Sequence, residues 1–109
     1  MAYNKVLAER IRQHLAGNGL REMHKFGGVG FLLRGNMLCG VIGDNFIARV
    51  GPQQYQVCLA RPHVREFDYT GHPMKGWVQV QPEGINEDAD LADWIELCRA
   101  YHLTLPEKQ

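Results

Sequence analysis

Two tight-turn signals a few residues apart constrain this chain more than any other feature. Arg34-Gly35-Asn36 is the first and Gly43-Asp44-Asn45 the second, and a short apolar segment, residues 37–42, separates them. Glycine, aspartate and asparagine tolerate the positive φ angles of tight hairpin turns. Parallel strands need a crossover of a dozen or more residues, so strands joined this closely run antiparallel. The sequence therefore predicts a three-stranded meander over residues 29–33, 37–42 and 46–50.

A helix is predicted before the meander, over residues 4–16. Apolar side chains recur there at helical spacing and form one stripe. The stripe consists of Leu7, Ile11 and Leu15, widened by Val6. Asn4 is a suitable N-cap, and Gly17 and Gly19 are suited to end the helix.

After the meander, the chain returns to the sheet and ends in a second long helix. Pro52 suits the start of a short helix over residues 53–60, and residues 66–69 and 76–81 have strand character. Asn86 is the predicted cap of the last helix, whose apolar face is made of Leu91, Trp94, Ile95, Cys98 and Tyr101. Asp88 and Asp90 place negative charge at its first turn.

Together these elements predict one α+β domain over residues 1–109. It has two layers, with an antiparallel sheet of about five strands (the meander plus a hairpin) and flanking N-terminal and C-terminal helices. Residues 21–26 are predicted to be a first strand or an extended lead-in to this sheet. No apolar run approaches the roughly 20 residues of a membrane span, and the N-terminus lacks a secretory pattern. A cytoplasmic protein is therefore predicted.

Charge is balanced overall but uneven along the chain. The formal net charge is zero; residues 1–50 carry seven basic and three acidic residues, and residues 51–109 carry five and nine. A neutral chain lacks the general basic field of non-specific nucleic-acid binders. The asymmetry is suited to docking the two halves together, or to pairing two copies.

Catalytic chemistry finds little support in the sequence. The chain has no serine, and its three cysteines, Cys39, Cys58 and Cys98, are widely spaced among apolar neighbours. They are predicted to be buried thiols, and Cys58 with His63 or His72 is the least improbable nucleophilic pair. The histidines show no metal-binding spacing. No catalytic residue, metal or cofactor is therefore predicted.

The glycine run from Phe26 to Phe31 invites comparison with a nucleotide-binding loop. Gly28-Val29-Gly30 supplies two glycines of that motif, but Leu33 stands in place of the third. A strand, not a helix, is predicted to follow, so no helix N-terminus is available for a phosphate. The run is instead interpreted as a kink or close approach of the backbone to another element.

The order of several short motifs resembles the amino-terminal domain of the TfoX (Sxy) competence-regulator family. Residues 25–33, Gly35-Asn36-Met37-Leu38 and Gly71-His72-Pro73-Met74 follow that pattern, as do residues 76–80 and 90–95. The structural signature consists of Phe26, Gly27, Gly28, Gly30, Gly35, Met37, Gly76, Trp77 and Trp94. The resemblance covers residues 6–102 and implies a two-layer α+β fold without established catalytic residues.

The resemblance implies a non-enzymatic, protein-binding regulator of transcription or of DNA-uptake competence, with a transcription factor as a candidate partner. A homodimer is a second candidate assembly, with Phe31 and Phe67 as exposed apolar contacts. Direct nucleic-acid binding is the alternative function. It would use Arg34, Arg49, Arg61 and Arg65 on one face, near Phe67 and Tyr69.

Overall fold

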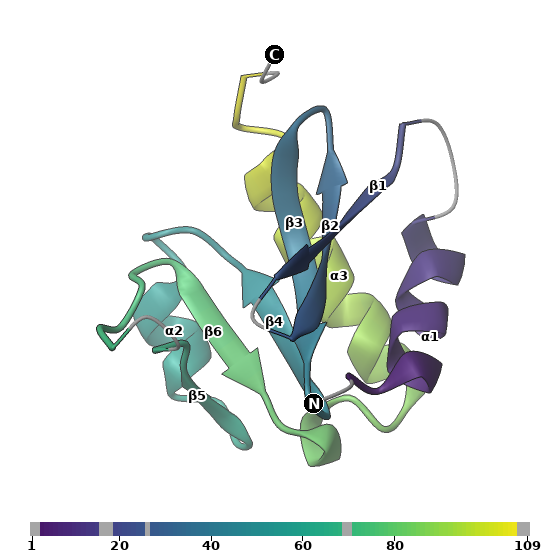
Figure 1. Cartoon of the computed structure of the whole chain (residues 1–109). Coiled ribbons are helices and arrows are strands. Elements are labelled where there is room, and N and C mark those ends of the chain that lie inside the picture. The colour runs from purple at the N-terminus through teal and green to yellow at the C-terminus, as the bar shows by residue number, and fades with distance from the viewer. Residues whose placement is uncertain (1–2, 16–18, 26, 69–70, 107–109) are drawn as a thin grey trace.

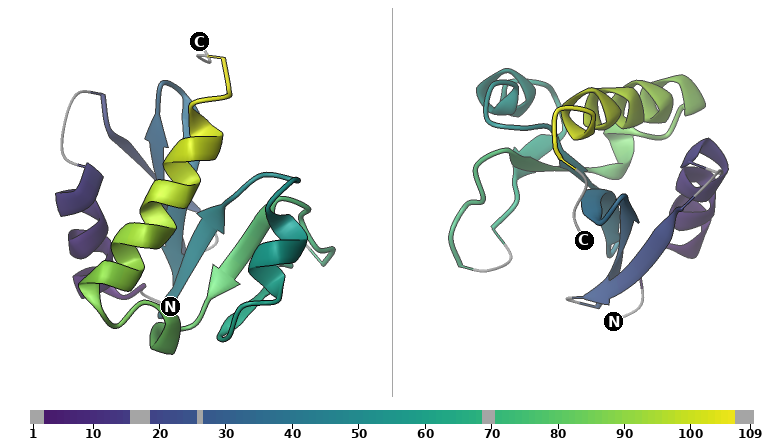
Figure 2. Two further views of the ribbon diagram at one scale, coloured as in Figure 1. Left: turned by 180° about the vertical axis from the view of Figure 1, so that it is seen from behind. Right: turned by 90° about the horizontal axis from the view of Figure 1, so that it is seen from above.

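A six-stranded antiparallel sheet with helices on one face makes up the domain (Figures 1 and 2). The computed structural model describes residues 3–15, 19–25, 27–68 and 71–106. Its elements are α1 (Lys5–Leu15), β1 (Arg21–Lys25), β2 (Gly28–Leu33), β3 (Asn36–Ile42), β4 (Asn45–Arg49), α2 (Tyr55–Leu59), β5 (Val64–Glu66), β6 (Trp77–Val80), the 3-10 helix η1 (Pro82–Gly84) and α3 (Asp88–His102). The predicted two-layer α+β fold is confirmed, with six strands.

The strand order is β1-β2-β3-β4-β6-β5, and every neighbouring pair is antiparallel. The predicted meander is therefore confirmed, and Arg21–Lys25, within the predicted 21–26 segment, forms the edge strand β1. The prediction of a strand over 66–69 is shifted: β5 is Val64–Glu66. After Glu66 the chain leaves the sheet, because Phe67 and Asp68 accept backbone hydrogen bonds from Met74 and Gly71. Tyr69 lies outside the described residues.

Helix α1 begins as predicted and buries all but one residue of its predicted stripe. The Oδ1 of Asn4 accepts a hydrogen bond from the backbone N–H of Leu7 at 3.0 Å, as an N-cap does. Leu7, Ile11 and Leu15 are buried, but Val6 is 72% exposed. The prediction for Val6 was wrong because it lies one residue, or about 100°, away from Leu7 around the helix. Gly17 lies outside the described residues.

Helix α3 lies across the sheet and buries Leu91, Trp94, Ile95 and Cys98. Its N-cap is Glu87, whose side chain makes no capping bond, so the predicted Asn86 cap is wrong. The carbonyl of Asn86 instead accepts a hydrogen bond from Arg10 of α1. The short helix α2 is also smaller than the predicted 53–60, because residues 52–54 form a turn before it.

The main core lies between the sheet and the helices. Strand residues at alternate positions fill it: Val29, Phe31, Val41, Phe46, Ala48, Val78 and Val80. Phe31 is fully buried, so the expectation that it is exposed for pairing was wrong. Beside it, Arg12 of α1 donates two hydrogen bonds to the Glu22 carboxylate, at 2.6 and 2.9 Å. This contact fastens α1 to β1 and lowers the pKa of Glu22.

The glycine run is confirmed as a backbone close approach, and the element approached is the neighbouring strand β3. Gly27 has φ of 74° in the turn between β1 and β2. A Cβ on Gly28 would overlap the carbonyl oxygen of Val41 in β3. A Cβ on Gly30 would meet only the flexible end of Met37, at 2.6 Å from its Cε. Two glycines of one strand therefore have different roles.

This difference predicts that alanine destabilises the domain at position 28 and is tolerated at position 30. Gly28→Ala forces backbone apart and is expected to lower the free energy of unfolding by about 1–3 kcal/mol, a cost typical of overpacking. Gly30→Ala needs only a rotation of the Met37 side chain and is expected to change stability by less than about 1 kcal/mol. Urea unfolding of both variants tests this, and equal losses would contradict it.

Trp94 is the largest side chain that α3 contributes to the core. It is 3% exposed, and the Arg61 guanidinium lies 4.3 Å from its ring centroid. We expect Trp94→Ala to cost about 3–5 kcal/mol, because it leaves a large cavity. Chemical denaturation measures this loss, and a change below about 1 kcal/mol would show that the ring does not support the core.

Candidate binding site on the open sheet face

The sheet face opposite the helices, here named the open face, carries no helix (Figures 1 and 2). Side chains alternate between the two faces of a strand. Because Val29, Val41 and Phe46 point into the core, their neighbours belong to the open face. The strand register aligns one row across it: Met23, Gly30, Gly40, Ile47, Gln79 and Arg65.

An apolar hollow of about 250 Å³ lies on this face. Its lining residues are Val29, Gly30, Met37, Gly40, Val41, Ile42, Ile47, Phe67, Met74 and Trp77. Gly30 and Gly40 stand directly opposite each other in β2 and β3, so no side chain rises from the middle of the row. The hollow exists because two glycines meet where larger residues flank them.

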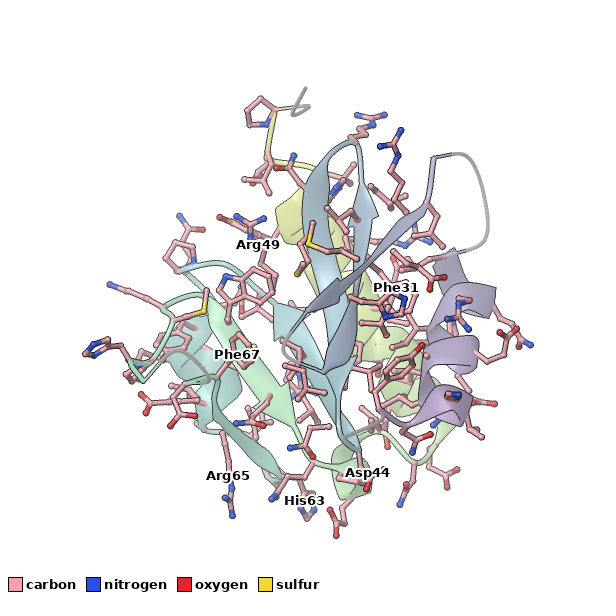
Figure 3. The ribbon with its side chains drawn as sticks, in the orientation of Figure 1. Phe31, Asp44, Arg49, His63, Arg65 and Phe67 are labelled. Atoms are coloured by element: carbon pink, nitrogen blue, oxygen red, sulfur yellow. The ribbon has the colours of Figure 1, made fainter. Side chains whose placement is uncertain are left out.

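Phe67, labelled in Figure 3, supplies one wall of the hollow together with Met74 and Trp77. Phe67 packs on Trp77 with ring centroids 6.0 Å apart. Phe67 is 4% and Ile47 3% exposed, and neither belongs to the main core cluster. The expectation of an exposed Phe67 was therefore wrong, because this wall and the sheet bury it in a second, smaller apolar cluster.

Arg49 borders the hollow and fixes the position of Trp77. Its guanidinium carbon lies 5.4 Å from the Trp77 ring centroid and 5.6 Å from that of Tyr101. Its Nη1 donates a 3.3 Å hydrogen bond to the Met37 carbonyl. Trp77 is half-buried in the wall of the hollow. The guanidinium holds both Trp77 and the strand that carries Met37.

The charges of the strand residues differ between the two faces. By alternation Arg21, Arg49 and Arg65 belong to the open face, and the strand carboxylates Glu22 and Glu66 belong to the helix face. Glu22 is bound by Arg12, and Glu66 accepts a 3.4 Å hydrogen bond from the Tyr55 hydroxyl. None of the described strand residues on the open face is therefore acidic.

The family model of the TfoX N-terminal domain matches residues 14–101. This chain belongs to the TfoX N-terminal domain family. No curated protein sequence matches this TfoX N-terminal domain, and no solved structure matches it. Among its described residues, none of the helices has the length and apolar character needed to traverse a bilayer.

In this TfoX N-terminal domain, several signature residues meet at the hollow. Gly30, Met37 and Trp77 line it, whereas Gly28 is at the β2–β3 close approach. Gly35 is in the β2–β3 turn with φ of 80°, and Trp94 is in the core on the other face. Phe26 lies outside the described residues. The signature therefore combines architectural positions with part of the lining of the apolar hollow.

Gly76 joins the two halves of the sheet. Its carbonyl accepts hydrogen bonds from the backbone N–H groups of Val50 and Gly51, at 2.8 and 3.0 Å.

The hollow residues that the sequence reasoning missed are Gly40, Ile42, Ile47 and Met74. Strand alternation from Phe46 would have placed Ile47 opposite the core, but no local signal brings Met74 to it.

The predicted arginine face does not form. Arg61 lies over Trp94 on the helix side, and Arg34 lines a different hollow beside α3. Arg49 and Arg65 are both on the open face, but at separate places (Figure 3). Strand alternation and the positions of the turns place these four arginines, predicted on one face, at separate sites.

All three cysteines are buried, as predicted. Burial raises the pKa of Cys98 to about 12 and that of Cys39 well above its ordinary value. Burial also raises the pKa of Cys58, while the Arg61 charge partly opposes that shift. Within the described part of the chain, no group of three or more histidine, cysteine, aspartate or glutamate side chains is arranged to hold a metal.

These pKa shifts predict slow thiol chemistry in the native domain. Thiolate is the reacting species, so raised pKa values lower its fraction at neutral pH. We expect a disulfide reagent at pH 8 to label the cysteines only slowly, Cys58 first, and to label all three rapidly in denaturant. Immediate native labelling of Cys58 would contradict its assignment as a structural thiol.

Proposed function

We propose that this TfoX N-terminal domain is a non-enzymatic protein-binding module that acts in transcription regulation through a protein partner. The apolar hollow on the open face carries the proposal. Family membership supports a role connected with competence regulators. The expected setting is the cytoplasm, where such a partner would be found.

The chemistry of the hollow favours a bulky apolar side chain as its occupant. Two methionines and two aromatic rings line it, and methionine adapts its shape to different apolar partners. A hollow of about 250 Å³ has room for one large side chain. Protein interfaces commonly gain their energy from such single anchors.

The charges around the hollow favour an acidic partner segment. Arg21 and Arg49 are on the open face, and Lys75 follows the lining residue Met74. Asp68, next to Phe67, is the opposing charge in this region. A partner that combines a bulky apolar anchor with neighbouring carboxylates would complement this surface. The same basic charges disfavour two open faces meeting in a homodimer.

Nucleic acid is the less favoured partner. Base stacking needs an accessible aromatic face. Trp77 has Arg49 over its ring and Phe67 beside it, and Phe67 is itself buried. Fluorescence anisotropy with random DNA and RNA at low salt is expected to show no binding, since phosphate contacts are strongest there. Tight, salt-dependent binding would favour the alternative function.

Photo-crosslinking in the native cell tests the proposed surface. Position 23 is suitable for the crosslinker because Met23 is 42% exposed in the same row as the hollow. Position 57 on α2 is the control, because Val57 is 62% exposed and lies away from the open face. We expect a defined protein adduct from position 23 and not from position 57.

A hollow-filling variant makes the test specific. Gly30→Val adds volume beside Met37 and is expected to reduce the position-23 adduct about tenfold or more, as loss of a central anchor does. Its thermal unfolding must match that of the parent. Equal adducts from both positions, or an adduct unaffected by Gly30→Val in a folded protein, would refute the open-face site. Turnover of a metabolite by the pure protein would refute the non-enzymatic role.

A further inference from the structure

A second hollow, of about 250 Å³, lies between the β2–β3 turn and the C-terminal end of α3. Its lining residues are Leu33, Arg34, Arg99, His102 and Leu103. Three of these five side chains are basic and none is a carboxylate. We propose that this hollow binds the phosphate group of a small phosphate monoester. The proposal is independent of the open-face function.

His102 holds the two sides of this hollow together. It is 8% exposed, and its Nε2 lies 2.8 Å from the Leu33 carbonyl oxygen. A carbonyl oxygen only accepts hydrogen bonds, so Nε2 carries the proton. The bond fixes the turn, and with it the backbone of Arg34, against the last turn of α3.

Arg99 is held in position by its own contacts and retains donors for a ligand. Its Nη2 donates a 3.1 Å hydrogen bond to the His14 carbonyl of α1. Its Nε is buried and lies 3.1 Å from a Glu96 carboxylate oxygen, without the alignment of a hydrogen bond. A guanidinium has five N–H groups, so these contacts leave part of the fork unused.

Arg34 occupies a backbone position that its residue type does not favour. Its φ is 54°, and Gly35 follows with φ of 80°. Two-residue hairpin turns of this kind prefer asparagine or glycine at the first position. Turn formation therefore does not explain the arginine. At this position the Arg34 guanidinium lies at the rim of a hollow that is also lined by Arg99 and His102, where it can contact a ligand.

The helix end is compatible with an anion at this place. A helix C-terminus carries partial negative charge, and basic residues in its last turn offset that charge. Here the N–H groups of Leu103 and Leu105 also donate to the carbonyls of Arg99 and His102, at 2.9 and 3.0 Å. Those carbonyls are thus already bonded, which lessens their repulsion of an incoming anion.

The lining favours an esterified phosphate over a free one. Guanidinium forks match the geometry of phosphate oxygens and bind them by charge-assisted hydrogen bonds. The remaining lining is apolar: Leu33 and Leu103, and Leu103 is 76% exposed beside the basic groups. An apolar or aromatic group attached to the phosphate would cover this leucine.

NMR titration of the full chain tests the site with defined probes. Adenosine monophosphate is the test ligand; inorganic phosphate and adenosine are its two separate parts. We expect adenosine monophosphate to shift the amide signals of Arg34, Gly35 and Leu103 saturably, and inorganic phosphate to shift them with weaker affinity. Adenosine is expected to leave them unchanged.

Variants separate this site from general electrostatics. Arg34→Gln is expected to weaken binding about fivefold or more, the loss of one charge-assisted contact, and Arg34→Lys to restore part of it. Arg65→Gln removes an exposed arginine on β5 and is the matched control. Arg34 is exposed, so its variants are expected to fold normally.

Three results would overturn the proposal. Absence of saturable shifts with both phosphate probes would exclude the site, and equal losses for Arg34→Gln and Arg65→Gln would show non-specific attraction. Equal affinity for inorganic phosphate and adenosine monophosphate would refute the ester assignment. Because Arg34 lies outside the first hollow and the open face, its variants leave crosslinking from position 23 unaffected, so the two proposals fail separately.

Discussion

Strands β2 and β3 lie against each other without side chains at their closest approach, and much of the domain depends on that contact. Gly28 leaves room for the Val41 carbonyl, and Gly30 faces Gly40 across the ladder. A Cβ on Gly40 would lie 2.7 Å from the Val29 carbonyl oxygen. The same missing side chains that let the strands pair also create the hollow on the open face.

Charged residues are unevenly distributed between the two halves of the chain and between the two faces of the sheet. The basic N-terminal half and acidic C-terminal half meet where Arg10 binds Asp88 at 3.1 Å. Arg10 also donates to the carbonyls of Ile85 and Asn86, so this contact closes α1 over the start of α3. The uneven distribution of charge along the sequence thus contributes one ion pair that docks the two halves of the chain. With Glu22 and Glu66 on the helix face, arginines remain on the open one.

Local chemistry predicted the fold well and the exposure of individual residues less well. The turns at 34–36 and 43–45 specified antiparallel strands, and helical spacing identified α1 and α3. Phe31 and Phe67 were expected at the surface, yet both are buried, on opposite faces of the sheet. Phe31 lies under Arg12 of α1, and Phe67 packs on Trp77 beside Met74. Neither contact is visible in local sequence.

The sequence by itself determined the antiparallel topology, the helices at each end and the family to which the domain belongs. These follow from turn residues, periodic apolar side chains and ordered motifs, which act over a few residues. Tertiary structure alone decided that Met37, Met74 and Trp77 surround one hollow, and that Arg34 joins Arg99 and His102 at another. Met37 is far in the chain from Met74 and Trp77, as Arg34 is from Arg99 and His102, and strand register and helix docking bring them together. The glycine run, which invites comparison with a nucleotide-binding loop, lines the apolar hollow, and the basic hollow of Arg34, Arg99 and His102 lies at the other end of the same strand.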